Sequence, residues 1–287
     1  MNAQAANADF LQAMAQSSRE RVARARAQQA DEAIRALAHA AAAAPMLELS
    51  PSGFDLIAEV KRRSPAVGQL DSGGEDVGAR ANDYATAGAA AISVLTEPTR
   101  FDGELSHLRE VTAALKGRVP AMRKDFLVDP YQVYEARVAG AGGVLVILRM
   151  LEPSQVAALL EAAAELRLFV LLEAFDEADL EFAAVLVRDY GARVKLLVGV
   201  NCRDLSTLQV VPGRLETLAP SLPRGVTCVA ESGVESGADA ARLARAGYGM
   251  ALVGSALMRT GDRIGLARDL LIAGRQGRQG RQGRQCG

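Results

Sequence analysis

The sequence predicts an α/β protein, a (β/α)8 TIM barrel that follows an N-terminal helical extension. Eight short apolar runs recur along the chain, each starting 23 to 34 residues after the previous one. This spacing leaves room for one helix and two short loops, the size of a βα unit. The runs are apolar almost throughout, as strands covered on both faces must be. Polar residues end six of them, and the carboxyl ends of the strands in such a barrel share the face that carries active sites.

Length and composition are consistent with this architecture. The chain has 287 residues, of which 49% are apolar, so it can bury a large core. The formal net charge of −1 argues against a nucleic-acid-binding or polybasic membrane protein. No apolar run reaches the roughly 20 residues that span a bilayer, and the N-terminus lacks the features of a secretory signal. We expect a cytoplasmic monomer or weak homodimer, with no nucleic-acid and no membrane partner.

Residues 1–48 form the predicted extension. They are rich in Ala, Arg, Gln and Glu, which are strong helix formers. We expect helices over Asp9–Gln28 and Asp31–Ala43, and then a turn at Pro51-Ser52-Gly53 before the first strand. Two interpretations stay open. The extension packs against the barrel or plugs its floor, or it forms a lid that carries an apolar residue such as Phe10 over the site.

Residues 49–273 form the predicted barrel. The expected strands are Leu56–Arg62, Ala90–Glu97, Val119–Phe126, Gly143–Leu148, Leu168–Phe175, Leu196–Cys202, Val226–Ser232 and Gly249–Ser255. The expected helices between them are Gly78–Thr86, Glu104–Leu115, Pro130–Ala139, Ser154–Leu166, Glu177–Tyr190, Val211–Ala219 and Ala238–Ala246. A doubly wound open sheet is the alternative, but its G-x-G-x-x-G signature is absent after the first strand.

Residues 274–287 differ from the rest of the chain. The triplet Gly-Arg-Gln occurs four times and is followed by Cys286 and Gly287. The segment has no apolar positions through these repeats, so we expect a disordered, solvated tail. A weak anion- or RNA-binding appendage is the alternative, because the segment carries four arginines.

Cysteine and histidine are too sparse for a metal or redox site. Cys202, Cys228 and Cys286 fit neither a zinc pattern nor a disulfide framework, and the first two fall in predicted strands as small core residues. His39 and His107 do not lie at strand ends, so histidine-based catalysis has little support. We therefore predict a site with no metal and no cofactor.

Charged residues at the ends of the first and third strands are candidates for acid–base chemistry. Glu59 and Lys61 point the same way because side chains alternate along a strand. An acid and a base that face the barrel interior would be costly to bury unless they pair or act on a ligand. Lys124 shares its face with Met122 and Phe126, and these apolar neighbours suggest a lowered pKa and a role as general acid. Snorkelling of Lys124 at the rim is the alternative.

The fifth and sixth strands add polar groups to the same face. Glu173 follows a run of apolar residues, where a carboxylate serves function more often than packing. The amide of Asn201 can orient a carboxylate or a hydroxyl. Arg203 can hold either a substrate or a neighbouring acid in place.

The last two strands end in glycine beside a hydroxyl, at Ser232-Gly233 and Gly254-Ser255. Glycine lets backbone N–H groups approach an anion, and a short helix after the eighth strand adds its positive end. Loops after these strands often hold phosphate in barrels of this kind.

Apolar residues near the predicted mouth complete the inventory. Pro65, Phe101 and Phe126 supply apolar surface against which a planar group could pack. The residues together describe a phosphorylated small-molecule substrate with an aromatic portion, acid–base chemistry and no metal.

Over roughly residues 54–260 the chain resembles the indole-3-glycerol phosphate synthases of tryptophan biosynthesis. The resemblance rests on six segments that follow the family's order: Ile57–Pro65, Ile92–Gly103, Met122–Ala141, Gly199–Leu205, Ala230–Val234 and Leu252–Arg259. It implies a carboxy-lyase that closes the ring of 1-(2-carboxyphenylamino)-1-deoxyribulose 5-phosphate, releases carbon dioxide and water, and needs no cofactor.

The resemblance also implies residue roles. Lys124 is the general acid at the substrate carbonyl, Glu59 and Glu173 exchange protons in later steps, and Lys61 binds substrate anions. Asn201, Arg203 and Ser232 fix the substrate and neighbouring charges. The backbone holds the phosphate at Gly233, Gly254 and Ser255, and the anthranilate ring is flanked by Ser64, Pro65, Phe101 and Phe126.

Two positions depart from the family's pattern. Cys202 stands where a second Asn is usual, and Ala66-Val67 replaces a Ser-Lys pair in the loop after the first strand. These changes leave room for a paralogue that acts on a substituted anthranilate in secondary metabolism. Two further alternatives are a phosphoribosylanthranilate isomerase, which would need a Cys at the first strand end, and a non-catalytic barrel that binds a phosphate metabolite.

Overall fold

The computed structural model describes residues 3–64, 68–70, 76–204, 207 and 209–285. Eight parallel strands close into a barrel in the order β1-β10-β9-β8-β7-β6-β5-β4. They are β1 (Asp55–Val60), β4 (Ala91–Leu95), β5 (Ala121–Lys124), β6 (Gly143–Ile147), β7 (Phe169–Ala174), β8 (Leu196–Asn201), β9 (Thr227–Glu231) and β10 (Met250–Val253). Each coincides with one predicted apolar run, so the predicted α/β barrel is confirmed. A short antiparallel ribbon, β2 (Arg63–Ser64) and β3 (Gly68–Gln69), follows β1.

Side chains alternate between the two faces of each strand, and this forms two hydrophobic layers, one outside and one inside the barrel. Leu56 and Ala58 belong to the outer layer between strands and helices, whereas Ile57 belongs to the cluster that fills the barrel. The same alternation turns Glu59, two residues after Ile57, into the interior. The apolar pattern that closes the barrel therefore also places charged side chains at its mouth.

Helices cover the barrel and their positions follow the sequence pattern. They are α3 (Val77–Ala87), α4 (Pro98–Phe101), α5 (Leu105–Leu115), α6 (Pro130–Val138), α7 (Pro153–Glu165), α8 (Glu177–Tyr190), α9 (Arg214–Leu218), α10 (Gly237–Ala246) and α11 (Ser255–Arg259), with 3-10 turns at Leu148–Met150 and Ala219–Ser221. Side-chain caps fix several starts. Asp76 accepts hydrogen bonds from the backbone N–H groups of Gly78 and Ala79 at α3. Only α9 is much shorter than its predicted span.

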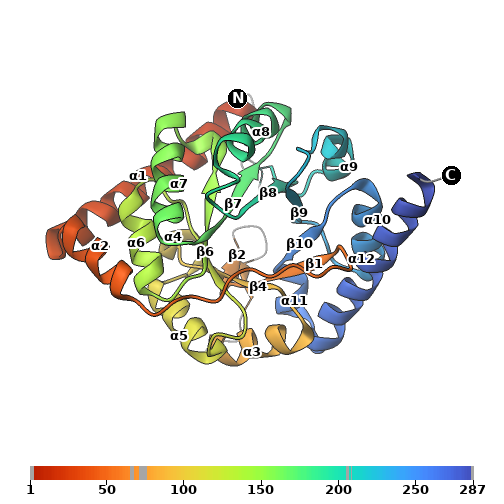
Figure 1. Ribbon diagram of the computed structural model, residues 1–287, viewed down its shortest axis with the longest axis horizontal. Helices are drawn as coiled ribbons and strands as arrows, with labels where there is room; N and C mark the ends of the chain where they lie inside the picture. The colour runs from red at the N-terminus through yellow and green to blue at the C-terminus, as the bar shows by residue number, and fades with distance from the viewer. Residues whose placement is uncertain (1–2, 65–67, 71–75, 205–206, 208, 286–287) are drawn as a thin grey trace.

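The N-terminal segment contacts both ends of the barrel. It forms α1 (Ala3–Gln28) and α2 (Asp31–Ala40), drawn in red and orange in Figure 1. Phe10 of α1 lines the cavity at the mouth, as the lid interpretation predicts. Leu47, between α2 and β1, packs into the cluster inside the barrel. Nearby, the carbonyl of Pro45 lies beside Gly142, just before β6 begins, so this stretch crosses the floor.

The C-terminal segment differs from the prediction of a disordered tail after residue 273. Helix α12 runs over Arg263–Gln285 and includes the Gly-Arg-Gln repeats; Figure 1 shows it in blue beside α10. Gly274 lies so close to the Phe54 ring that an added Cβ would come within 2.1 Å of it, and Gly277 approaches the backbone of Ala241 in the same way. Tertiary packing thus orders a sequence that has little apolar surface of its own.

Arginines of the first two repeats hold this helix to the barrel floor. Arg275 Nε donates to the carbonyl of Phe54 at 3.2 Å, and Arg278 donates to the carbonyl of Gly247 at 2.9 Å. These carbonyls lie just before β1 and β10. The arginines therefore satisfy backbone acceptors where the strands begin.

The remaining sequence expectations concern cysteines and membranes. Cys202 and Cys228 are free thiols in the core, as predicted, and burial raises the pKa of Cys228 to about 12. Cys286 lies outside the described residues. Among the helices that the structure describes, none is long and apolar enough to cross a membrane.

Candidate active site

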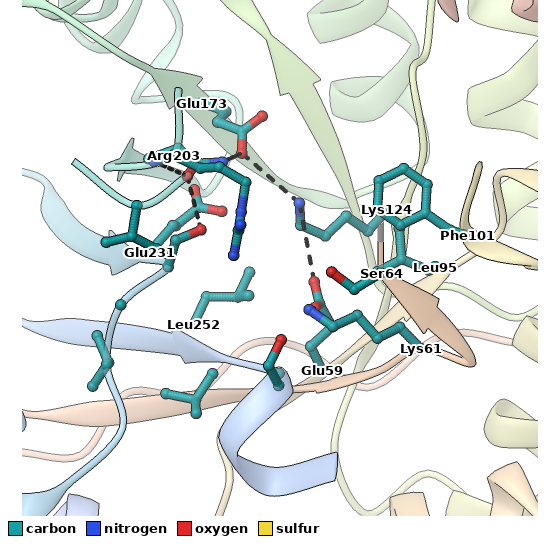
Figure 2. A pocket seen from close by; sticks show the side chains of 18 of the residues that line it. Glu59, Lys61, Ser64, Leu95, Phe101, Lys124, Glu173, Arg203, Glu231 and Leu252 are labelled. Carbon is teal, nitrogen blue, oxygen red and sulfur yellow. Dashed lines mark hydrogen bonds and ion pairs between the residues drawn. The ribbon is translucent and has the colours of Figure 1, made fainter. Parts of the chain in front are cut away.

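A cavity of about 340 Å³ opens at the carboxyl ends of the strands and collects the predicted site residues. Figure 2 shows charged side chains from several strands pointing into it. Its lining includes Glu59, Lys61, Ser64, Phe101, Lys124, Phe126, Glu173, Asn201, Arg203, Ser232, Gly233, Gly254 and Ser255. Pro65, the remaining candidate, lies outside the described residues.

Glu59 and Lys61 form an ion pair inside the mouth. Their Oε1 and Nζ atoms are 2.7 Å apart, and both side chains are largely buried. Burial alone would raise the pKa of Glu59. The positive charges of Lys61 and Lys124 outweigh it, so the pKa of Glu59 lies below its usual value. Glu59 is therefore an ionised carboxylate at neutral pH.

Lys124 lies between two carboxylates, as Figure 2 shows. Its Nζ atom is 3.8 Å from Glu173 Oε1 and 4.0 Å from Glu59 Oε2. Burial opposes the charge, but Glu173 and Glu59 outweigh it and raise the pKa of Lys124 above its ordinary value. The predicted lowered pKa is therefore wrong, because the decisive neighbours come from β1 and β7 rather than from the adjacent apolar residues. Lys124 is a charged proton donor.

Asn201 is the centre of a hydrogen-bond network across three strands. Its Nδ2 donates to Glu173 Oε1 at 2.8 Å. Its Oδ1 accepts from Ser232 Oγ at 2.9 Å and from the backbone N–H of Arg203 at 3.0 Å. With donor and acceptor both engaged, the amide has one orientation and fixes the Glu173 carboxylate beside Lys124.

Glu231 is a site residue that the sequence analysis did not assign. It ends β9, lines the cavity and is 1% exposed. Neither carboxyl oxygen accepts a hydrogen bond from the described residues. Burial, followed by the negative charge of Glu173, raises the pKa of Glu231 well above its ordinary value, so this carboxyl group holds its proton more tightly than an ordinary glutamate. Its position after an apolar run, on the face of Val229, was the signal that could have identified it.

The turn after β9 has unusual backbone geometry. Ser232 and Gly233 both lie in the left-handed region, with φ of 68° and 69°. That conformation is strained for Ser232 by about 1 kcal/mol. Ser232 is held there by its bond to Asn201 and by Cys202, whose Sγ donates to the Ser232 carbonyl at 3.2 Å. Cys202 thus stabilises the turn through this hydrogen bond. Gly254, Ser255 and Arg203 face the same end of the cavity and make it suitable for an anion.

The opposite end of the cavity is aromatic. The Phe126 ring lies 6.2 Å from that of Phe101 and 5.9 Å from that of Phe10, measured between centroids. Leu145 and Ile147 add aliphatic surface from β6. The cavity thus has a polar end with a glycine-containing turn, a centre with buried charges and an apolar end.

A second layer of charges holds the strand end that carries Lys124. Asp125 accepts bonds from Arg21 of α1 at 2.7 and 2.8 Å and from Arg123 at 3.1 Å. Burial opposes ionisation of Asp125, but these two arginines keep its pKa far below the usual range. Arg62, at the end of the first predicted strand, is not among the residues that line the cavity, and its guanidinium contacts His107 of α5.

Metal ligands do not gather in this part of the protein. Within the described residues, no three His, Cys, Asp or Glu side chains are placed to hold a metal ion.

Comparison with known proteins shows which family this chain is similar to. The sequence model of the family described as indole-3-glycerol phosphate synthase matches residues 11–270. A curated indole-3-glycerol phosphate synthase of Nocardioides sp. is 46% identical over 224 residues, which cover 78% of this chain and 82% of that protein. Its counterpart in Mycobacterium leprae is 42% identical over 240 residues, covering 82% and 85%.

Solved structures support the barrel. A 3-hexulose-6-phosphate synthase from Salmonella typhimurium aligns with a TM-score of 0.60 at 16% identity, over 78% of this chain and 99% of that chain. At this identity the likeness shows the fold alone.

Proposed function

The chain belongs to the indole-3-glycerol phosphate synthase family, and we propose that its cavity closes the ring of 1-(2-carboxyphenylamino)-1-deoxyribulose 5-phosphate. One observation carries this proposal. The amine of Lys124 lies within 4.0 Å of two carboxylates, in a cavity that is also lined by the Ser232–Gly233 turn and by Phe101 and Phe126. A substrate with a phosphate at one end and an anthranilate ring at the other would present its carbonyl to Lys124.

Substrate orientation comes from the two ends of the cavity. The backbone at Gly233, Gly254 and Ser255, with Arg203 and Lys61, supplies donors and charge for the phosphate. Phe101 and Phe126 flank the ring. Holding both ends brings the ring carbon close to the carbonyl carbon and converts the condensation into an oriented unimolecular step.

Condensation requires a proton donor at the carbonyl oxygen. As the ring carbon attacks, a carbon–carbon bond forms and negative charge develops on that oxygen. The Lys124 ammonium group stabilises the charge and donates its proton. Its raised pKa keeps it protonated until the transition state makes the oxygen basic. The bond to the carboxylate then breaks, carbon dioxide leaves, and the electron pair restores the aromatic ring.

Dehydration completes the reaction. The hydroxyl group leaves as water after it receives a proton. A base takes a proton from the neighbouring carbon, which is bonded to the nitrogen, and the double bond forms between the two carbons. Glu231 is a carboxyl group of the site with a raised pKa, and this suits the donor role. Glu59 is ionised and suits the base role, with Lys61 holding it in position. Glu173 keeps Lys124 oriented and can accept protons during the cycle.

The complete acid–base set favours this function over a non-catalytic barrel that only binds a phosphate metabolite. Binding a phosphate would not require three buried carboxyl groups around an amine, because each is costly to desolvate. The other proposed properties are those of the sequence prediction: a cytoplasmic monomer or weak homodimer.

The test is an assay of the purified full-length protein with the carboxyphenylamino-deoxyribulose phosphate. We expect indole fluorescence to appear together with equimolar carbon dioxide. Absence of indole product with this substrate, from protein whose folding is verified by circular dichroism, would refute the proposal. Turnover of ring-substituted substrates in preference to the unsubstituted one would identify the paralogue that the loop and Cys202 departures leave open.

A further inference from the structure

We propose that Gly199 is a positioning residue, because its missing side chain leaves the recess in the barrel interior that holds the carboxyl group of Glu231 beneath the substrate. The inference rests on the function proposed above and concerns how one of its acids is placed. No contact of Gly199 with substrate is required.

The geometry places the Glu231 carboxyl group where a side chain at residue 199 would lie. Gly199 is on β8 between Leu197 and Asn201, both of which face the barrel interior. Asn201 pairs in register with Glu231 on the adjacent strand β9. A Cβ atom on Gly199 would come within 1.9 Å of Glu231 Oε1 and 3.0 Å of its carboxyl carbon. We call this space the Glu231 recess.

The recess matters because other restraints on the carboxyl group are weak. Neither oxygen of Glu231 accepts a hydrogen bond from the described residues, unlike Glu173, which Asn201 holds at 2.8 Å. The Glu231 carboxyl group is therefore held by packing and, when it is protonated, by a hydrogen bond to Glu173. Filling the recess would displace the carboxyl group from the position in which it can hold and donate a proton.

The fold should tolerate a methyl group at this position. Besides Glu231, the nearest atom to the added Cβ is Leu171 Cδ1 at 3.1 Å, and both neighbours are ends of flexible side chains. Gly143 provides the contrast, because a Cβ there would lie 2.4 Å from the rigid ring of Phe169, and its three nearest atoms all belong to that ring. Gly143→Ala is therefore a control for packing damage inside the same barrel.

The same arrangement recurs directly after β10. A Cβ on Gly254 would come within 2.2 Å of Glu59 Oε1 and 2.9 Å of Lys61 Nζ, so this glycine makes room for the Glu59–Lys61 pair. Gly254 also belongs to the proposed phosphate turn, and a substitution there would mix two effects. Gly199 has no proposed contact with the phosphate, so a substitution there tests the placement of a carboxyl group alone.

The experiment is a double-mutant cycle in the full-length enzyme. Gly199→Ala should lower kcat by roughly 10–100-fold, with KM changed less than about threefold, because an acid is displaced while the phosphate and ring sites are intact. In the Glu231→Asp background, the shorter side chain withdraws the carboxyl group from the added methyl, and Gly199→Ala should cost less than about threefold. Equal losses in both backgrounds would overturn the proposal, as would a matching kcat loss without a shift in melting temperature for Gly143→Ala.

An infrared measurement separates this proposal from the proposed function. The band of a protonated carboxyl group that disappears in Glu231→Gln should shift or vanish in Gly199→Ala and stay in place in Gly143→Ala. This result does not depend on turnover. An unchanged band in Gly199→Ala would refute the recess, whereas a parent enzyme that makes no indole product would refute the function alone.

Discussion

The two ends of the barrel use charge in different ways. At the mouth, cations pair with carboxylates: Lys61 and Lys124 contact Glu59, and Arg21 contacts Asp125. At the floor, Arg275 and Arg278 of α12 donate to the backbone carbonyls of Phe54 and Gly247, and Arg275 also lies 3.5 Å from Asp55. The lysine and glutamate side chains at the mouth can exchange protons, whereas the arginines at the floor tie one element to another. The comparison indicates that α1 serves the site and α12 serves closure of the barrel.

The strongest test of the mouth is Lys124→Met. Loss of the proton donor should lower indole formation by roughly 10²–10⁴-fold. Phosphate binding should largely survive, since the turn after β9 is untouched. Steady-state kinetics and a phosphate titration measure the two effects. Lys195→Met, at an exposed lysine, is the control. Turnover near that of the parent would remove Lys124 from its proposed role.

Arg21→Met tests whether α1 acts on the site. The change leaves Asp125 buried with Arg123 and Thr96 as its remaining side-chain partners among the described residues. We expect a loss of about 2 kcal/mol in the free energy of unfolding, below the full cost of an unpaired buried charge. Lys124 should shift with the strand end, so kcat/KM should fall roughly tenfold. Urea unfolding and kinetics check this, with the exposed Arg19→Met as control. A loss of stability with unchanged kinetics would show that α1 stabilises the fold but does not act on the site.

Arg278→Ala tests the floor. The side chain donates to the Gly247 carbonyl at 2.9 Å, and its removal should cost about 1–2 kcal/mol of unfolding free energy. Activity at a temperature where the enzyme stays folded should equal that of the parent, because the site is at the other end of the barrel. The exposed Arg268→Ala on the same helix should change neither property. A fall in kcat would contradict the division between mouth and floor.

The smallest expected effect is a pH dependence of stability at Glu231. Its folded-state pKa lies well above the ordinary value of 4.5, so the folded protein holds a proton that the unfolded chain releases. This contribution is present below about pH 4.5 and is lost as pH rises toward the folded-state pKa. Glu231→Gln should therefore gain stability relative to the parent as pH increases. Melting temperatures from pH 4 to 8 measure it, and a constant difference would show that Glu231 is ionised when folded.

Sequence patterns could predict the barrel and most of the site because both depend on strand alternation. Glu59, Lys124 and Glu173 follow apolar runs whose ends must meet at one face. The pKa of Lys124 could not be predicted, since its decisive neighbours come from distant strands. The helical structure of α12 could not be predicted either, because the local propensity of Gly-Arg-Gln repeats favours disorder. Its helix depends on contacts with Phe54 and Ala241 that only the folded barrel provides.

The triplet period of α12 has a consequence for the length of this helix. Three residues turn an α-helix by about 300°, so successive copies of the triplet rotate by roughly 60° around the axis. The first two copies can therefore both face the barrel, and by Gly280 no atom lies within 4 Å of the position of a Cβ. Gaining or losing a copy beyond that point would change the helix by about 4.5 Å while the docked copies keep their contacts. Variation in copy number at this terminus should therefore be neutral for folding and for chemistry.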